Sequence, residues 1–342
     1  MSINQPSDLI THIIQSWSSN IGHNITIGLS GGVDSVVLLH ALHQITSSQS
    51  LQLTAIHVNH GISDNASSWA SFCQELCSSL GIPLIIKHCK LVRSGGESLE
   101  NIARRARYQE FFACGSDVIA LAHHQDDQIE TTLSQLFRGS DLHNIAAMHA
   151  ITTKNNKLFW RPLLDISRKQ IEDYAKKYNL KYITDESNAD TTYLRNFIRH
   201  KVMPLLSDWD NQIKTKLLNF NRQLQDTLAI TDEVAATDLN TCLIKNNEIP
   251  NLKLNEFDII DLDKFKRFSS LRQLNLIAWF IKTQNLPLPT NRQLTEFVQQ
   301  ATTSDYDKRP QLKLGPDAQI LKYKTQIFVD TPGQAQGTLS RV

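Results

Sequence analysis

The 342-residue sequence has few of the features that mark secreted or membrane proteins. No basic segment followed by an apolar one opens it, and no apolar run approaches the roughly 20 residues that cross a bilayer. Its five cysteines include no Cys-x-x-Cys pair, and their odd number argues against a disulfide framework. We therefore expect a cytoplasmic protein with free thiols and no membrane contact.

The sequence also has little excess charge, with a formal net charge of +1. Any contact with nucleic acid must therefore involve a local patch of basic residues rather than the whole surface. Two basic stretches stand out, "ARRARY" at 103–108 and "RNFIRHK" at 195–201, and an acidic one, "DESNAD", lies at 185–190. The composition is ordinary for a globular protein, and the length predicts at least two domains.

The first 120 residues alternate between apolar, strand-like runs and helical patterns. The strand-like runs are "NITIGL" at 24–29, "LQLTAIHV" at 51–58, "PLIIKHC" at 83–89 and "DVIALA" at 117–122. Short buried strands separated by helices indicate a parallel sheet that is covered on both faces. We predict an open α/β fold, whose ligands usually bind beyond the carboxyl ends of the strands.

The pattern changes near residue 209, where helical periodicity suggests a connecting segment. A helix packed on the first domain is the alternative interpretation. Further helices are expected at 167–179, with Ser167 as N-cap, and at 193–206, interrupted by Pro204. We expect a small mixed α/β module downstream, with helices at 265–284 and 291–300 and a strand or hairpin at 319–330. The predicted parts are a catalytic domain at 1–208, a connecting helical segment at 209–245, a C-terminal domain at 246–330 and a tail at 331–342.

The stretch "ITIGLSGGVDSV" at 25–36 predicts a strand, a glycine turn and a helix. Such a turn exposes backbone N–H groups at the positive end of the helix dipole, and Ser30 and Ser35 add hydroxyl donors, so it suits phosphate. The GxxxxGK[ST] pattern is absent, and Asp34 stands in the loop instead. A carboxylate beside a polyphosphate usually needs Mg²⁺ between them. The alternative is a glycine turn with a structural role only.

The second polar cluster, "AHHQDDQIET" at 122–131, follows the last predicted strand. Its imidazoles and carboxylates are suitable metal ligands, whereas acidic residues at a helix start are also common for electrostatic reasons. On a helix, Asp127 and Glu130 stand at i and i+3 and present two carboxylates on one face. Such a pair suits a cationic amine or a second Mg²⁺.

Six strings in order resemble the bacterial tRNA(Ile)-lysidine synthases, members of the N-type ATP pyrophosphatase (PP-loop) superfamily. They are "SGGVDS", "ENIARRARY", "AHHQDDQIET", "RPLLD", "DESNAD" and "RNFIRHKVMP". Together they cover roughly residues 24–205, and residues 276–329 more weakly resemble the first C-terminal domain of that family. The resemblance implies a ligase that uses ATP, Mg²⁺ and free L-lysine. Its tRNA substrate would be the isoleucine tRNA with a CAU anticodon, whose wobble cytidine becomes lysidine through an adenylated intermediate, with release of pyrophosphate and AMP.

The resemblance also implies roles for individual residues. The ATP-binding set is Ser30, Gly31, Gly32, Val33, Asp34, Ser35, Arg104, Arg107, His123 and Asp126, of which Asp34 and Asp126 would hold Mg²⁺. The catalytic set is Asp34, Asp127, Glu130 and Arg195. Whether Asp127 and Glu130 hold the amino groups of lysine or accept a proton stays open. We assign Arg105 and Arg199 as surface charges.

The chain departs from the family pattern in "RGSDLHNI", where Asp141 and Asn144 replace expected glycines. Asparagine tolerates positive φ, so Asn144 is expected to keep the path of the loop, whereas Asp141 puts its shape in doubt. Two other functions stay open: another PP-loop enzyme of tRNA modification, such as a thiolation enzyme, and a tRNA-binding protein without turnover. The oligomeric state, a homodimer included, is also open.

Overall fold

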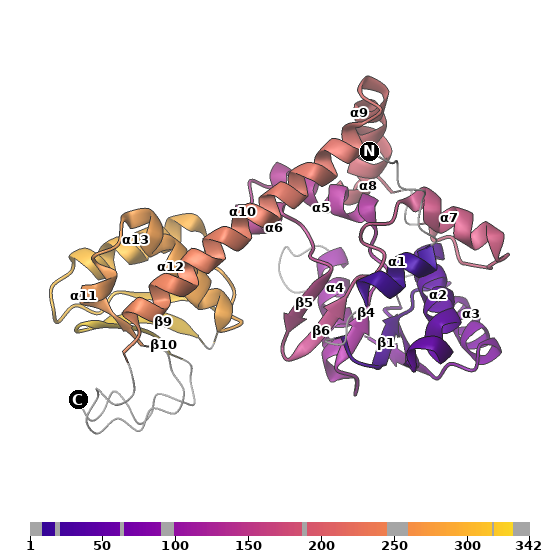
Figure 1. Ribbon diagram of the computed structural model, residues 1–342, viewed down its shortest axis with the longest axis horizontal. Coiled ribbons are helices and arrows are strands. Elements are labelled where there is room, and N and C mark those ends of the chain that lie inside the picture. Colours follow the sequence, from indigo (N-terminus) through magenta and orange to yellow (C-terminus); the bar gives the residue numbers. More distant parts are fainter. Residues whose placement is uncertain are drawn as a thin grey trace. The chain divides into compact units, whose positions relative to one another are not determined.

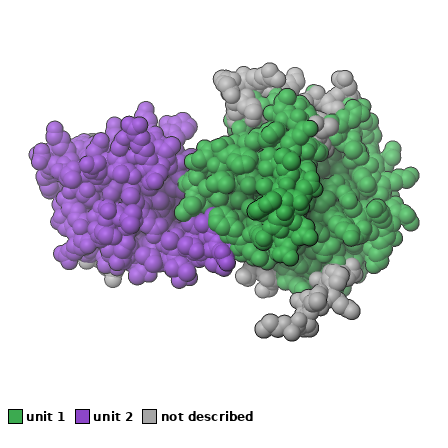
Figure 2. Space-filling view, turned by 90° about the horizontal axis from the view of Figure 1, so that it is seen from above, with its two compact units in different colours: residues 1–222 green, residues 223–342 purple. Residues whose placement is uncertain are grey.

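The computed structural model describes residues 9–17, 21–61, 65–89, 99–186, 190–244, 259–316 and 318–330. The chain divides into two compact units, residues 1–222 and 223–342 (Figures 1 and 2). The predicted tail at 331–342 and part of the acidic stretch at 185–190 lie outside the described residues. Within the described ranges, no helix has both the length and the apolar character needed to cross a membrane.

Unit 1 contains a six-stranded sheet in the order β3-β2-β1-β4-β6-β5 (Figure 1). The strands are β1 (Asn24–Gly28), β2 (Gln52–Asn59), β3 (Leu84–His88), β4 (Val118–Ala120), β5 (Ile151–Lys154) and β6 (Lys157–Trp160). All neighbours pair in parallel except β5, which is antiparallel to β6. The predicted parallel α/β fold is thus confirmed, whereas the β5–β6 hairpin was not predicted.

Successive side chains along a strand point to opposite faces of the sheet, so the apolar side chains of these strands form two separate clusters. Ile25 and Ile27 of β1 point into the larger core, which also contains residues of α1 (Leu9–Ser16), α2 (Val33–Gln49), α3 (Ala66–Ser79) and α7 (Arg168–Lys177). Ile119 of β4 belongs to a second cluster with Phe111 of α4 (Leu99–Ala113). The sheet is therefore covered on both sides.

The strand order reverses at β1. Strands β2 and β3 follow β1 on one side, and β4 and β6 continue on the other. In open α/β sheets, ligands bind outside the carboxyl ends of the strands at such a switch point. The segments that leave β1 and β4 there are the glycine loop and the "AHHQDD" stretch, which enters α5 (Gln125–Phe137).

The loop after α5 differs from the expectation for Asp141 and Asn144. Asp141 has φ −67° and is the N-cap of α6 (Leu142–Ile145), where its carboxylate accepts hydrogen bonds from the backbone and side-chain N–H groups of Asn144. Neither residue needs a positive φ; Gly139 supplies one at +65°. The two substitutions thus build a capped turn.

The segment around Pro204 stays helical, contrary to the predicted interruption. Helix α8 (Leu194–Phe197) passes into a π-helical turn at Ile198–Val202 and then into α9 (Met203–Trp209). Pro204 falls in the first turn of α9, where its missing N–H matters least. The π-helical turn thus allows the chain to remain helical through the proline.

Helix α10 (Ile213–Cys242) runs through the connecting segment predicted at 209–245, and the two units divide within it, after Arg222. Unit 2 has an antiparallel sheet in the order β7-β10-β9-β8, made of β7 (Ile260–Asp261), β8 (Gln311–Lys313), β9 (Gln319–Tyr323) and β10 (Gln326–Asp330). Helices α11 (Leu262–Phe265), α12 (Ser270–Thr283) and α13 (Asn291–Thr303) share its core. The predicted hairpin at 319–330 is confirmed as β9–β10.

Candidate active site

The glycine loop after β1 is held in shape by Ser35 of α2. The Ser35 hydroxyl accepts hydrogen bonds from the backbone N–H groups of Ser30 and Gly31, both at 3.2 Å, and donates to the carbonyl of Gly32 at 3.0 Å. Gly32 is the N-cap of α2 and has no side chain to cap the first turn. The helix start therefore offers N–H groups to an anion without competition from a capping side chain.

Gly31 is the residue of this loop that only glycine fits. Its φ is +90°, and an added Cβ would lie 2.7 Å from Cδ1 of Ile183. The Ile183 backbone N–H also donates to the Gly31 carbonyl at 2.9 Å, so the segment around Ile183 fixes the loop from outside.

Asp34, in the first turn of α2, is held by an arginine from α7. Nη1 of Arg168 lies 2.8 and 2.9 Å from the two carboxylate oxygens of Asp34, and Nε of Arg168 donates to Glu172 at 2.9 Å. Ser167 caps α7 reciprocally with Gln170, which confirms the predicted N-cap and fixes the start of the helix that carries Arg168. Burial raises the pKa of Asp34, although His124 and Arg168 act in the opposite direction.

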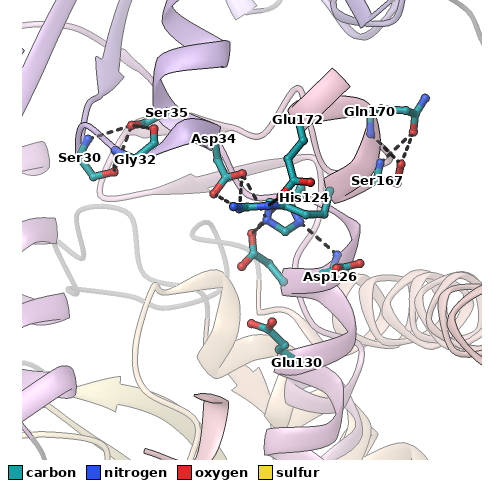
Figure 3. A network of polar contacts seen from close by, with 12 residues as sticks. Ser30, Gly32, Asp34, Ser35, His124, Asp126, Glu130, Ser167, Gln170 and Glu172 are labelled. Carbon is teal, nitrogen blue, oxygen red and sulfur yellow. Dashed lines mark hydrogen bonds and ion pairs between the residues drawn. The ribbon is translucent and has the colours of Figure 1, made fainter. Parts of the chain in front are cut away.

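His124 connects the glycine loop with α5 (Figure 3). Its Nε2 lies 3.6 Å from Oδ1 of Asp34 and 3.5 Å from Oδ2 of Asp127. His124 is also the N-cap of α5: its Nδ1 accepts from the Asp126 N–H, and the Asp127 carboxylate accepts from the His124 N–H at 2.9 Å. Because Nδ1 accepts, the proton of a neutral imidazole is on Nε2, between the two carboxylates.

Two carboxylates of α5 are bridged by two arginines from the α8 segment. Arg195 donates through Nη2 to Asp127 and through Nε to Glu130 at 2.7 Å. Arg199 donates to both oxygens of Glu130, at 2.6 and 2.9 Å. Glu130 is 2% exposed, and its buried charge is balanced by the two guanidinium groups.

The pKa of Asp127 is about 2. Burial alone would raise it, but the charges of His124 and Arg195 and the hydrogen bond from the His124 backbone outweigh that effect. Asp127 therefore stays ionised at neutral pH, and a carboxylate with so low a pKa is a poor proton acceptor.

His123 is half-buried beside this network. Burial, together with the charges of Arg161, Arg195 and Arg104, lowers its pKa to about 3 against the attraction of Asp127. Its Nδ1 is buried and finds no hydrogen-bond partner among the described residues. A neutral imidazole with an unused ring nitrogen is suited to a polar ligand.

The arginines of α4 also reach the carboxyl edge of the sheet. Arg104 stacks on the ring of Tyr108 at 5.3 Å and lowers the pKa of His123, which follows β4. Arg107 lowers the pKa of His60, which follows β2, and burial brings that pKa to about 4. Both predicted arginines thus lie close enough to affect groups at the switch-point edge.

Asp126 does not join the other predicted metal ligand. Its carboxylate pairs with Lys214 of α10 at 3.0 Å, whereas Asp34 pairs with Arg168. In the part of the chain that the structure describes, no group of three His, Cys, Asp or Glu side chains could hold a metal ion. The predicted pairing of Asp34 with Asp126 on Mg²⁺ stays a prediction.

Three residues of the network were missed or misassigned from the sequence. Arg199, interpreted as a surface charge, binds Glu130. It stands at i+4 from Arg195, a spacing that places two residues on one helix face as the i, i+3 spacing of Asp127 and Glu130 does, and this was a usable signal. Arg168 was not singled out, and His124 was considered only as a possible metal ligand in the cluster at 122–131. The N-cap at Ser167 placed Arg168 at a helix start, but nothing in the sequence directed it to Asp34, 134 residues away.

Comparison with known proteins places this geometry in context. A family model described as a PP-loop domain matches residues 7–206, and one described as the TilS substrate binding domain matches residues 260–327. The chain is similar to the tRNA(Ile)-lysidine synthase of Nitrosomonas europaea, with 40% identity over 301 residues, 86% of this chain and 63% of that protein. The corresponding protein of Chromobacterium violaceum is 39% identical over 307 residues, 88% of this chain and 68% of that protein. The chain thus spans about two thirds of the length of these relatives.

Among solved structures, the chain resembles the U34-tRNA thiolase NcsA from Methanococcus maripaludis with its [4Fe-4S] cluster. The TM-score is 0.52 at 19% identity, over 64% of this chain and 78% of that one. At this identity the likeness bears on the fold alone.

Proposed function

The chain belongs to the tRNA(Ile)-lysidine synthases of the PP-loop family, and on this premise we propose that it joins free L-lysine to the wobble cytidine of an isoleucine tRNA with a CAU anticodon. One observation carries the proposal. An unbroken series of contacts runs from the glycine loop through Asp34, His124, Asp127, Arg195 and Glu130. A loop suited to phosphate and a carboxylate pair suited to an amine are thus neighbours at one sheet edge.

The first half-reaction is adenylation of the cytosine. The cytosine O2 attacks the α-phosphate of ATP, a P–O bond forms, and the bond to the β-phosphate breaks with release of pyrophosphate. The uncapped N–H groups at the start of α2, next to the glycine loop, are our proposed pyrophosphate site. Unpartnered Nδ1 of His123 is a candidate contact to the nucleotide.

Magnesium fits next to Asp34. Carboxylate oxygens are the ligands that it prefers, and Asp34 lies in the first turn of the helix whose start we assign to pyrophosphate. When bound, the ion would neutralise charge on the phosphates. Arg168, which now holds both oxygens of Asp34, is a second cation at the same place.

The second half-reaction transfers lysine. Its deprotonated ε-amine attacks C2 of the adenylated cytosine, a C–N bond forms, and AMP leaves with the bonding electrons of the C–O bond. The proton that the amine loses passes to solvent. We propose that Asp127 and Glu130 orient the amino groups and that neither stores the proton. Asp127 has a pKa of about 2, and Glu130 already accepts hydrogen bonds from two arginines.

A direct assay tests this proposal. The protein is mixed with a transcript of its isoleucine CAU tRNA, MgATP and labelled lysine, and the label retained on RNA is measured. Retention that requires ATP supports lysidine formation. A methionine tRNA with the same anticodon serves as the RNA control. Pyrophosphate release without retention would contradict lysine transfer, and binding of tRNA with neither would point to a protein without turnover.

A nucleophilic role in thiolation is disfavoured for Cys73 and Cys77 by their burial. Cys73 and Cys77 are buried in α3, and burial raises their pKa values to about 12 and about 11. Thiols of such pKa are not nucleophiles at neutral pH.

The low pKa values of Asp127 and His123 predict that neither group shapes the pH profile of lysine transfer. Asp127 (pKa about 2) and His123 (pKa about 3) do not change charge above pH 5. The ε-amine of free lysine, with a pKa of about 10.4, must lose its proton before attack. We therefore expect kcat/KM for lysine to rise by about tenfold per pH unit between about pH 6.5 and about 8.5.

Pyrophosphate release in the absence of lysine is the control, and it should change little over the same range because no amine takes part. An inflection of kcat/KM for lysine near pH 6 or 7 would contradict this account and assign the proton to a group of the protein.

A further inference from the structure

Arg168 stands where a cation is unfavourable for the helix that carries it. It is the first residue of α7 and follows the N-cap Ser167. The N-terminal end of a helix carries a partial positive charge, so a guanidinium in the first turn is repelled by the helix. The reciprocal hydrogen bonds of Ser167 and Gln170 hold the start of α7 without Arg168. The reason for an arginine at this position therefore lies outside α7.

The Arg168 guanidinium is held on one side and has donor capacity left on the other. Nη1 donates to both oxygens of Asp34, at 2.8 and 2.9 Å, and Nε donates to Glu172 at 2.9 Å (Figure 3). Nη2 makes no hydrogen bond to any residue that the structure describes. Because the side chain is 39% exposed, a ligand can reach this guanidinium.

Asp34 cannot keep its pair with Arg168 and also hold a metal ion. Both carboxylate oxygens face Nη1 of Arg168, and Oδ1 also lies 3.6 Å from Nε2 of His124. Mg²⁺ takes oxygen ligands at about 2.0–2.1 Å in near-octahedral geometry. A guanidinium on the same two oxygens would repel the ion at short range. Binding of the metal at Asp34 therefore requires that Arg168 leaves the carboxylate.

The released guanidinium would find the proposed phosphate site beside it. Asp34 is the second residue of α2, and the uncapped start of this helix offers N–H groups to an anion. Guanidinium groups bind phosphate oxygens through two parallel N–H bonds, and Nη1 with the unused Nη2 forms one such edge. The bond from Nε to Glu172 can persist while that edge changes its partner.

We infer that Arg168 is an exchangeable counter-ion: it holds Asp34 in the ATP-free protein, and when MgATP binds it releases Asp34 to Mg²⁺ and binds the pyrophosphate part of ATP through Nη1 and Nη2. Asp34 then has a cation beside it in both states. The departing pyrophosphate meets a guanidinium as its negative charge develops. This inference rests on the proposed function and adds to it a residue that couples metal binding to nucleotide binding.

Binding of Mn²⁺ without nucleotide tests the first half of the exchange. Mn²⁺ prefers the same oxygen ligands as Mg²⁺, and its binding is followed by electron paramagnetic resonance. In Arg168→Gln we expect the Mn²⁺ affinity to rise about 3–30-fold, because no guanidinium competes for the Asp34 carboxylate. The gain should vanish when Asp34→Asn is added to Arg168→Gln. A residue that only held Asp34 in position would give a lower Mn²⁺ affinity instead.

Binding of inorganic pyrophosphate with Mg²⁺ tests the second half, by calorimetric titration. Its affinity should fall about 10–100-fold in Arg168→Gln, since a charge-assisted contact is lost. Lys169→Gln is the matched control, because Lys169 is the next residue of α7, is exposed, and makes no ion pair with a residue that the structure describes. Lys169→Gln removes the same charge and should change neither affinity by more than about twofold.

Arg168→Lys decides the question if the glutamine variant does not fold. Its ammonium keeps a cation on Asp34, so the Mn²⁺ affinity should stay within about twofold of the unmodified value. The affinity for pyrophosphate should fall about 3–10-fold, because an ammonium lacks the two-nitrogen edge of a guanidinium. Unchanged pyrophosphate affinity in Arg168→Lys would then overturn the inference.

Failure of the proposed function gives a different result from failure of the exchange. Neither titration contains tRNA or lysine, so a protein that transfers no lysine can still bind Mn²⁺ more tightly and pyrophosphate more weakly after Arg168→Gln, which would support the exchange. Lysine transfer by the unmodified protein, with both affinities unchanged in Arg168→Gln, would overturn the exchange and leave the function standing. In folded Arg168→Gln, any result other than a gain for Mn²⁺ with a loss for pyrophosphate overturns it.

Discussion

Replacing Asp127 by asparagine is expected to lower lysine transfer by about 10²–10³-fold, while pyrophosphate release with tRNA and ATP changes by less than about tenfold. Asparagine keeps the shape of the side chain and can still accept from the His124 backbone. It removes the negative charge that faces Arg195 and the His124 imidazole. The amine would then meet an uncompensated guanidinium where we propose that a carboxylate orients it.

Two measurements make this result decisive. Thermal unfolding shows whether Asp127→Asn is folded. We expect it to fold, because Arg195 retains its hydrogen bond to Glu130 in the variant. Asp165→Asn is the control, since Asp165 is exposed and its pair with Arg222 lies outside the network. Lysine transfer by Asp127→Asn within about tenfold of the unmodified rate would remove Asp127 from the transfer step.

Much of the fold follows from local pattern. The runs at 24–29, 51–58, 83–89 and 117–122 became β1 to β4, because buried parallel strands need continuous apolar residues. The β5–β6 hairpin escaped prediction because its turn is Asn155–Asn156, two residues at positive φ without the glycine that usually marks such turns. The interruption predicted at Pro204 was wrong because the π-helical turn that precedes the proline has no recognisable signal in the sequence.

The site was predictable to the extent that its residues are close in sequence. Asp127 and Glu130 share one helix face, and helical spacing indicated the pair. Their partners were harder to find, since Arg195 and Arg199 join them across more than 60 residues. The Asp126–Lys214 pair is more distant still, and its members were not linked by any local signal.

The carboxylates of the network are paired with arginines before any substrate enters. Asp34 pairs with Arg168, which also pairs with Glu172, whereas Asp127 and Glu130 pair with Arg195 and Arg199. Binding of ATP adds negative charge on the Asp34 side, where Arg168 and a Mg²⁺ ion would compensate it. In the function we propose, lysine would add an amine on the Asp127 side. The two proposed substrates would then act on opposite ends of one set of contacts, which would give a physical reason for adenylation and amine transfer to share one edge of the sheet.

Replacing Gly31 by alanine is expected to lower adenylation strongly. Alanine at φ +90° costs about 1–2 kcal/mol in the backbone. Its Cβ would also lie 2.7 Å from Ile183 and 3.4 Å from the Cys73 sulfur, so the loop must move. We expect pyrophosphate release to fall by about 10²–10³-fold, because displaced N–H groups no longer meet the phosphates.

Gly81→Ala is the matched control for backbone strain, since Gly81 has φ +66° and open space around its Cα. Gly81→Ala should lose a similar amount of stability because of its positive φ, and its rate of adenylation should stay within about twofold of the unmodified rate. The further loss of stability in Gly31→Ala then measures the clash, and Ile183→Ala in the same chain should recover part of that loss. Recovery of stability without recovery of pyrophosphate release would mean that the left-handed conformation of Gly31 aims the N–H groups. Normal pyrophosphate release by Gly31→Ala alone would contradict the assignment of this loop to ATP.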